Sequence, residues 1–317
     1  MLGHNKSVCA RALIATGVCA AVSLLGLGSG AGALGQASVR PASITPAALP
    51  APHAITPGTS GSFTFAGYAP LSDRPVKVWY AAPAGDLTNA RVIVVMHGQS
   101  RRAEAYRDRW TAAARNAGAI LIVPEFSTAL YPGTNAYNLG NVGREPQSRW
   151  SYSIIEPLFD FVRADTGNRT SRYFLYGHSA GAQFVHRLLF LVPTNRVARA
   201  VVANAGWYTA PEIEIGFPYG LRNSPVTDTA LRAALGSRIT VLLGENDTNP
   251  DDTDLRHTSG ADRQGFHRLA RGQFFYRAGL RTARLLGQPF GWNLVTVPGA
   301  AHSNGAMVPA ATQALFG

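Results

Sequence analysis

The chain of 317 residues has only two cysteines, Cys9 and Cys19, and both lie within the first 35 residues. The remainder therefore offers no thiol nucleophile, no disulfide and no cysteine ligand for zinc. Acidic residues are also few, since 18 Asp and Glu stand against 29 Lys and Arg, for a formal net charge of +11. The arginines are spread along the chain and no nucleic-acid-binding motif occurs. We therefore expect no nucleic-acid partner.

Long apolar runs are also missing, because no run after residue 35 reaches the length of a membrane span. Residues 1–35 combine basic Lys6 and Arg11 with an apolar middle and a small-residue end, which is typical of a secretory signal peptide. An uncleaved anchor is the alternative, but five glycines between residues 26 and 35 leave its apolar core short. We expect a secreted or periplasmic protein, without stable membrane insertion, whose net charge falls to +9 when Lys6 and Arg11 are removed.

Residues 36–60 are rich in Pro, Ala, Ser and Thr, and we expect a flexible lead-in without a core of its own. From residue 61 to 317, apolar runs alternate with helix-like segments, which predicts one α/β domain with a mostly parallel central sheet and helices on both faces. The expected strands are 63–65, 76–80, 91–96, 119–123, 172–176, 197–203, 239–243 and 292–297, and the clearest helices are 103–117, 150–164, 183–191 and 262–286.

The most specific motif is Gly177-His178-Ser179-Ala180-Gly181, which has the form G-x-S-x-G. It stands between an expected strand and an expected helix, which is the arrangement of a nucleophile elbow. Small residues at both ends of the motif suit a strained turn whose backbone approaches its neighbours closely. Ser179 is therefore the candidate nucleophile of a serine hydrolase.

A serine nucleophile of this kind is followed along the chain by an acid and then by a histidine. Asp247 stands directly after the expected strand 239–243, where it would orient the histidine and stabilise its charged form. We favour Asp247 because it lies nearest to the strand. Other acids in the same loop are left as rivals or as solvated loop residues: Glu245, Asp251, Asp252 and Asp254.

His302 follows the last expected strand, within Pro298-Gly299-Ala300-Ala301-His302-Ser303, where small neighbours leave room for the ring. A lone histidine is usually a surface or core residue, but this position favours a general base. The backbone N–H of Ala180 and that of Gln99, in the loop after strand 91–96, are the candidate oxyanion donors. No metal or organic cofactor is required for this chemistry.

Four segments together resemble the α/β-hydrolase superfamily: VIVVMHG at 92–98, GHSAG at 177–181, GEND at 244–247 and PGAAHS at 298–303. Within it, the chain resembles secreted esterases of the polyhydroxybutyrate depolymerase and feruloyl esterase type. That resemblance implies an α/β-hydrolase fold for residues 61–317. It also implies hydrolysis of an ester substrate, either a small molecule or a polymer such as hydroxyalkanoate oligomers.

The substrate pocket is less defined by the sequence. Trp207 and Tyr208 follow the expected strand 197–203 at the catalytic edge, where they could hold an acyl or aryl group or simply pack in the core. A serine peptidase of the same fold is an alternative function, since a triad alone does not separate esters from amides. A non-catalytic cationic surface-binding protein is the other alternative. The oligomeric state is not readable from the sequence.

Overall fold

The computed structural model describes residues 54–317, so the predicted signal peptide and the lead-in up to residue 53 lie outside the described residues. The fold begins a few residues before position 61. The backbone amides of Ala54 and Ile55 donate to the Asp165 carboxylate at 2.9 Å, and the Ile55 side chain is buried. The last residues of the predicted lead-in therefore pack against the domain.

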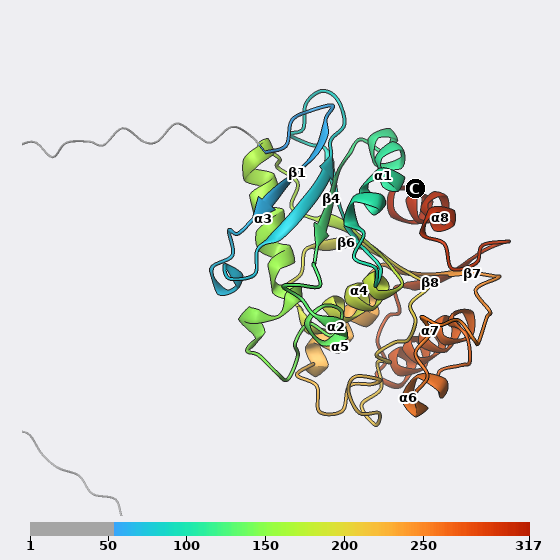
Figure 1. Cartoon of the computed structure of the whole chain (residues 1–317). Helices are drawn as coiled ribbons and strands as arrows, with labels where there is room; N and C mark the ends of the chain where they lie inside the picture. The colour runs from blue at the N-terminus through green and yellow to red at the C-terminus, as the bar shows by residue number, and fades with distance from the viewer. Residues whose placement is uncertain (1–53) are drawn as a thin grey trace, which may run out of the picture. The chain divides into compact units, whose positions relative to one another are not determined.

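The described residues form one eight-stranded sheet in the order β1-β2-β4-β3-β5-β6-β7-β8 (Figure 1). β1 pairs antiparallel with β2 and β2 antiparallel with β4, whereas every pairing from β4 to β8 is parallel. This confirms the mostly parallel sheet. The strands are β1 Ser60–Phe65, β2 Val76–Ala81, β3 Arg91–Met96, β4 Ala119–Glu125, β5 Tyr173–His178, β6 Val197–Ala203, β7 Ile239–Gly244 and β8 Trp292–Val297.

Helices cover both faces of the sheet, and alternate residues of the central strands serve the two faces. In β3, Val92 and Val94 enter one buried cluster while Ile93 and Val95 enter the other. The first cluster is covered by α3 Ile155–Thr166, α4 Ala180–Leu191, α5 Asp228–Gly236 and α7 Arg268–Leu285. The second is covered by α1 Ala103–Asn116 and α8 Asn304–Phe316, which lie side by side (Figure 1).

Three expected helices differ from the observed ones at their beginnings. The helix expected over 183–191 begins at Ala180, directly after Ser179. The segment 262–286 is divided into a short α6, Ser259–Asp262, and the long α7, because His267 is the N-cap whose side chain accepts from the Ala270 amide at 3.2 Å. The segment 150–164 begins with the 3₁₀ turn η3 Ser151–Ile154 before α3. The remaining short elements are η1 Ala69–Leu71, α2 Gly133–Ala136 and η2 Gln147–Arg149.

The parallel arrangement brings the ends of distant strands to one edge of the sheet. β3, β5, β7 and β8 all run in the same direction, so the residues that follow them meet at their carboxyl ends. The candidate nucleophile, acid, base and oxyanion donors are all among these residues. Among residues 54–317, no helix is long and apolar enough to cross a membrane, and no cluster of three His, Cys, Asp or Glu side chains could hold a metal ion.

Candidate active site

Ser179 lies on a strained turn between β5 and α4. Its φ is +58° and its ψ is −119°, a backbone conformation that L-residues rarely adopt. A Cβ at Gly177 would overlap the backbone of Gly181, and a Cβ at Gly181 would overlap the Met96 carbonyl at the end of β3. The glycines are therefore required by close backbone approach, as predicted for a nucleophile elbow. The Ser179 amide donates to the Ala203 carbonyl at 3.0 Å and fixes the turn to β6.

Asp247 and His302 meet although 55 residues separate them. The distance from His302 Nδ1 to Asp247 Oδ2 is 2.7 Å. The Asp247 carboxylate is buried, with 3% of its surface exposed, so its hydrogen bond is shielded from water. With Nδ1 donating to the carboxylate, Nε2 is the nitrogen left to exchange a proton with a substrate or nucleophile. His302 and Ser179 line the same small cavity of about 330 Å³.

The rival acids occupy other positions in the loop. Glu245 accepts from the Thr296 hydroxyl at 2.8 Å on the exposed side of β8, and Asp251 is exposed. Asp252 is tied to the site by Arg268, a buried guanidinium that lies 2.8 Å from the Asp252 carboxylate and 3.5 Å from that of Asp247. Arg268 also lowers the pKa of Asp252. Asp252 is therefore linked to the candidate acid, which the sequence did not indicate.

A buried histidine covers the ring of His302. The ring centroids of His178 and His302 are 4.6 Å apart, and His178 Nδ1 lies 3.2 Å from the Tyr106 hydroxyl. Burial, together with the charges of His302 and Arg268, holds the pKa of His178 well below its usual value. His178 therefore remains neutral at neutral pH and adds no positive charge beside the ring of His302.

The loop after β3 is held in place by buried contacts of His97. The Tyr137 hydroxyl donates to the His97 carbonyl at 2.7 Å, and the Phe126 amide donates to His97 Nε2 at 3.0 Å. Gln99 follows this anchored residue and lines the same cavity as Ser179 and Ala180. The residues that carry the two candidate oxyanion donors, Gln99 and Ala180, thus line one cavity with Ser179.

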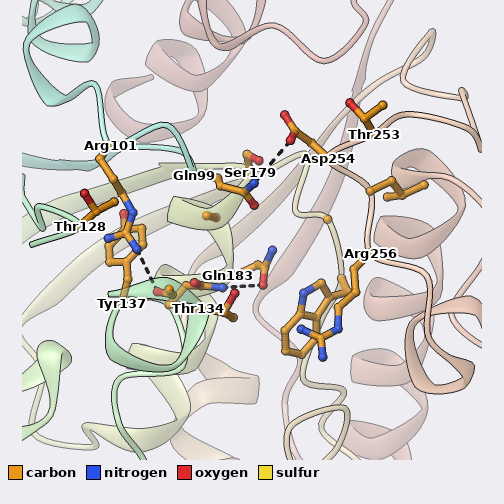
Figure 2. Close-up of a pocket in the computed structure, with 16 residues that line it drawn as sticks. Gln99, Arg101, Thr128, Thr134, Tyr137, Ser179, Gln183, Thr253, Asp254 and Arg256 are labelled. Carbon is orange, nitrogen blue, oxygen red and sulfur yellow. Dashed lines mark hydrogen bonds between the residues drawn. The ribbon is translucent and has the colours of Figure 1, made fainter. Parts of the chain in front are cut away.

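A larger cavity of about 450 Å³ extends from Ser179 (Figure 2). Of the two aromatic candidates, Trp207 lines it, whereas Tyr208 does not. The Tyr208 side chain is fully buried and stacks on Phe275 with centroids 4.5 Å apart, so its role is core packing. The lining residues are Gln99, Arg101, Thr128, Gly133, Thr134, Tyr137, Asn138, Ser179, Ala180, Gln183, Gly206, Trp207, Thr253, Asp254, Leu255 and Arg256.

Sequence reasoning missed the arginines around the site. Arg101 and Arg256 line the large cavity, and the buried Arg187 lies over the Trp207 ring. Arg187 and His186 interrupt the apolar run Phe184–Leu191 shortly after the nucleophile motif. That interruption is the signal that could have found Arg187, since charged residues are almost never fully buried without a reason.

Three buried histidines make the stability of the protein sensitive to acid. His97 and His186 each accept a backbone N–H on Nε2 while Nδ1 faces a carbonyl, and His178 is buried at the end of β5. Burial lowers the pKa of His97 to about 3 and the pKa values of His178 and His186 well below 6.5. Below pH 6.5 these histidines bind protons in the unfolded chain but stay unprotonated in the folded protein. The free energy of unfolding therefore falls as pH falls.

We expect each of these histidines to contribute a loss of about 1.4 kcal/mol per pH unit between pH 6 and 5, above the range where carboxylates titrate. Urea unfolding at pH 8, 7, 6 and 5 measures this slope. The variant His186→Phe removes one titrating group, so its slope should be about one third smaller. A free energy of unfolding that is unchanged from pH 7 to 5 would contradict buried neutral histidines.

Two solved hydrolases resemble this protein in both sequence and structure. It is similar to poly(aspartic acid) hydrolase-1 from Sphingomonas sp. KT-1, with 43% identity over 83% of this chain and 100% of that chain and a TM-score of 0.80. It is also similar to LpqC, a poly(3-hydroxybutyrate) depolymerase from Bordetella parapertussis, with 34% identity over 81% and 89% of the two chains and a TM-score of 0.75. No family model and no curated protein matches the sequence.

A more distant similarity extends to acetyl xylan esterase from Aspergillus awamori, with 14% identity over 81% of this chain and 100% of that chain and a TM-score of 0.52, which shows the fold alone. The predicted superfamily and the resemblance to polyhydroxybutyrate depolymerases are confirmed. Two hydrolases are thus at least 34% identical to this chain, and the match covers 89% or more of their own lengths. The chain therefore belongs to the α/β-hydrolase superfamily and is a carboxylic ester hydrolase of the esterase and depolymerase type.

Proposed function

We propose that the protein is an exported serine hydrolase that cleaves carboxylic esters through an acyl-enzyme on Ser179. The observation that carries this proposal is the 2.7 Å contact of His302 with the buried Asp247 at the edge of the cavity that Ser179 lines. Export is supported by the signal-like residues 1–35. A position at the carboxyl ends of parallel strands is usual for the active site of such a fold.

In this mechanism, Ser179 Oγ attacks the ester carbonyl carbon while His302 Nε2 takes the hydroxyl proton. The tetrahedral intermediate collapses, His302 gives the proton to the departing alcohol, and the acyl group stays bonded to Ser179. Water then attacks the acyl-enzyme with His302 as base, the bond to Oγ breaks and the proton returns to Ser179. The free carboxylic acid leaves.

Asp247 and two backbone donors support these steps. Asp247 accepts the Nδ1–H of His302, which selects the tautomer that can take the serine proton and stabilises the imidazolium. The N–H groups of Ala180 and Gln99 bond to the oxyanion, and one such donor typically lowers the barrier by about 3 kcal/mol. The side chain of Trp207 contacts the bound substrate from the cavity wall.

The substrate is an ester of a small molecule or a polymer, and hydroxyalkanoate oligomers and feruloyl or aryl esters are the first to test. A second candidate is an amide-linked polymer, cleaved by the same steps with an amine as leaving group. The 43% identity to a protein named for poly(aspartic acid) favours this second candidate over an unspecific peptidase. Initial rates on an aryl ester, 3-hydroxybutyrate oligomers, a feruloyl sugar and poly(aspartic acid) separate these classes.

A fluorophosphonate probe tests the nucleophile directly. We expect stoichiometric labelling of the folded protein, with the modified peptide containing Ser179, because only an activated serine reacts at an appreciable rate. Ser179→Ala should remain unlabelled. Ser72→Ala is the control, because Ser72 is exposed and distant from Ser179 in the sequence, and this variant should be labelled like the wild type. A folded wild-type protein that never reacts at Ser179 would instead favour the non-catalytic surface-binding protein.

A further inference from the structure

Arg101 lies on one wall of the large cavity and is held rigidly there. Its guanidinium stacks over the Tyr137 ring at 4.1 Å. It donates to the backbone carbonyls of Phe126 at 2.6 Å, Tyr131 at 3.2 Å and Gly133 at 2.9 Å. All of these acceptors are neutral, so the positive charge of Arg101 is fixed in place but not cancelled.

Arg187 supplies a second positive charge beneath the cavity floor. It is fully buried, and its guanidinium lies over the Trp207 ring at 4.1 Å. Its bonded partners are the Thr209 hydroxyl and oxygens of Asn138 and Gln183, all neutral, and its Nη2 has no partner. Burial lowers the pKa of Arg187 to about 10, so the group is still charged at neutral pH.

Arg256 presents a third guanidinium at the same indole ring. It lies 5.1 Å from the Trp207 centroid, and its Nε donates to the Tyr219 hydroxyl at 2.9 Å. Arg256 is exposed and lines the cavity. Figure 2 shows Arg256 at one end of this cavity and Arg101 with Tyr137 at the other, with Ser179 between them.

No carboxylate of the described chain neutralises these three arginines. Within residues 54–317, none of them forms an ion pair. Asp254 is the one acidic side chain among the residues lining this cavity, and it accepts from Gln99 Nε2 at 3.4 Å. The cavity beside Ser179 therefore has an excess of positive charge, and all three arginines lie over aromatic rings that also offer apolar contact.

We propose that the Arg101–Tyr137 stack and the Trp207–Arg256 stack are two carboxylate subsites on the two sides of Ser179. This inference rests on the proposed function and narrows its substrate class to chains that carry carboxylates on both sides of the bond to be cleaved. The guanidinium fork of Arg256 matches a carboxylate in shape and charge, since its bond to Tyr219 uses Nε. Both terminal nitrogens of Arg101 already donate to carbonyls, so Arg101 attracts a carboxylate by its charge. The buried charge of Arg187 strengthens the attraction because water does not screen it. Neutral polyesters lack the groups that these subsites bind.

Calorimetric titration of the full chain with Ser179→Ala tests the subsites without turnover. The probes are N-acetylated tetra-aspartate and N-acetylated tetra-asparagine, which have nearly the same shape and differ in charge. We expect tetra-aspartate to bind more tightly, and Arg101→Gln or Arg256→Gln to raise its Kd about tenfold each. Arg256→Lys keeps the charge but loses the fork, so its Kd should rise by less. Raising the salt from 20 to 500 mM, roughly, should weaken tetra-aspartate alone.

Arg238→Gln is the matched control, because Arg238 is exposed and precedes β7 at the opposite edge of the sheet. It should leave the Kd of tetra-aspartate unchanged. Arg256 is exposed, so its variants test the proposal even if loss of the Arg101 anchor prevents folding. Equal Kd values for the two peptides, or wild-type binding by Arg256→Gln, would overturn the subsites. The subsites would also be overturned if Arg238→Gln raised the Kd of tetra-aspartate as much as Arg256→Gln does. Failure of Ser179 to react with the fluorophosphonate would overturn the proposed function instead.

Discussion

Asp247→Asn is expected to reduce turnover of an aryl ester by a factor on the order of 10⁴ while the protein stays folded. The carboxylate accepts the Nδ1–H of His302 at 2.7 Å. An asparagine in its place can turn its N–H toward Nδ1, which moves the ring proton to Nε2. His302 can then no longer take the proton of Ser179, so the loss falls on kcat. Steady-state kinetics, with folding checked by circular dichroism, measure it.

Asp251→Asn is the matched control, because Asp251 belongs to the same loop and is exposed. We expect it to remain within a factor of about two of the wild type, as is usual for a surface substitution away from a site. Asp252→Asn is a separate case, because Asp252 contacts Arg268, which in turn lies 3.5 Å from Asp247. A nearly normal rate in Asp247→Asn together with an inactive Asp251→Asn would place the acid elsewhere in the loop.

The fold could be predicted because its parallel strands are buried on both faces. Such strands are almost continuous apolar runs, and β3 and β7 were recognisable for this reason. Helix beginnings were less predictable. His267 looks like a helical residue in the sequence, yet its side chain caps α7, which depends on the three-dimensional position of the ring.

The candidate nucleophile, acid and base could be located because each follows the carboxyl end of a strand, and chain order then limits the choice. The residues that line the substrate pocket could not be located in this way. Trp207 and Tyr208 are neighbours after β6, but only the structure separates the one that lines the cavity from the one that stacks on Phe275. Arg101 and Arg256 line the same cavity although 155 positions separate them in the sequence. No local sequence pattern could therefore have assigned them to one site.

Gly177→Ala is expected to remove most of the stability of the protein. A Cβ at this position would overlap the Gly181 carbonyl and approach the Ala182 amide nitrogen to 2.7 Å. Both are backbone atoms at the start of α4, so no rotation of a side chain relieves the overlap, and β5 or the helix must shift. We expect a loss of about 4 kcal/mol or more, out of the 5–15 kcal/mol that holds a typical domain folded.

Urea unfolding of purified protein measures this loss, and Gly216→Ala provides the control. A Cβ at Gly216 would have the Arg222 Nη2 atom as its nearest neighbour, at 3.7 Å, which is ordinary contact with the end of a flexible side chain. Its free energy of unfolding should therefore change by about 0.5 kcal/mol or less. If Gly177→Ala unfolds at the urea concentration of the wild type, β5 and α4 are not as close as the elbow requires. The conformation of Ser179 would then lose its steric explanation, since the same approach of strand and helix forces its φ of +58°.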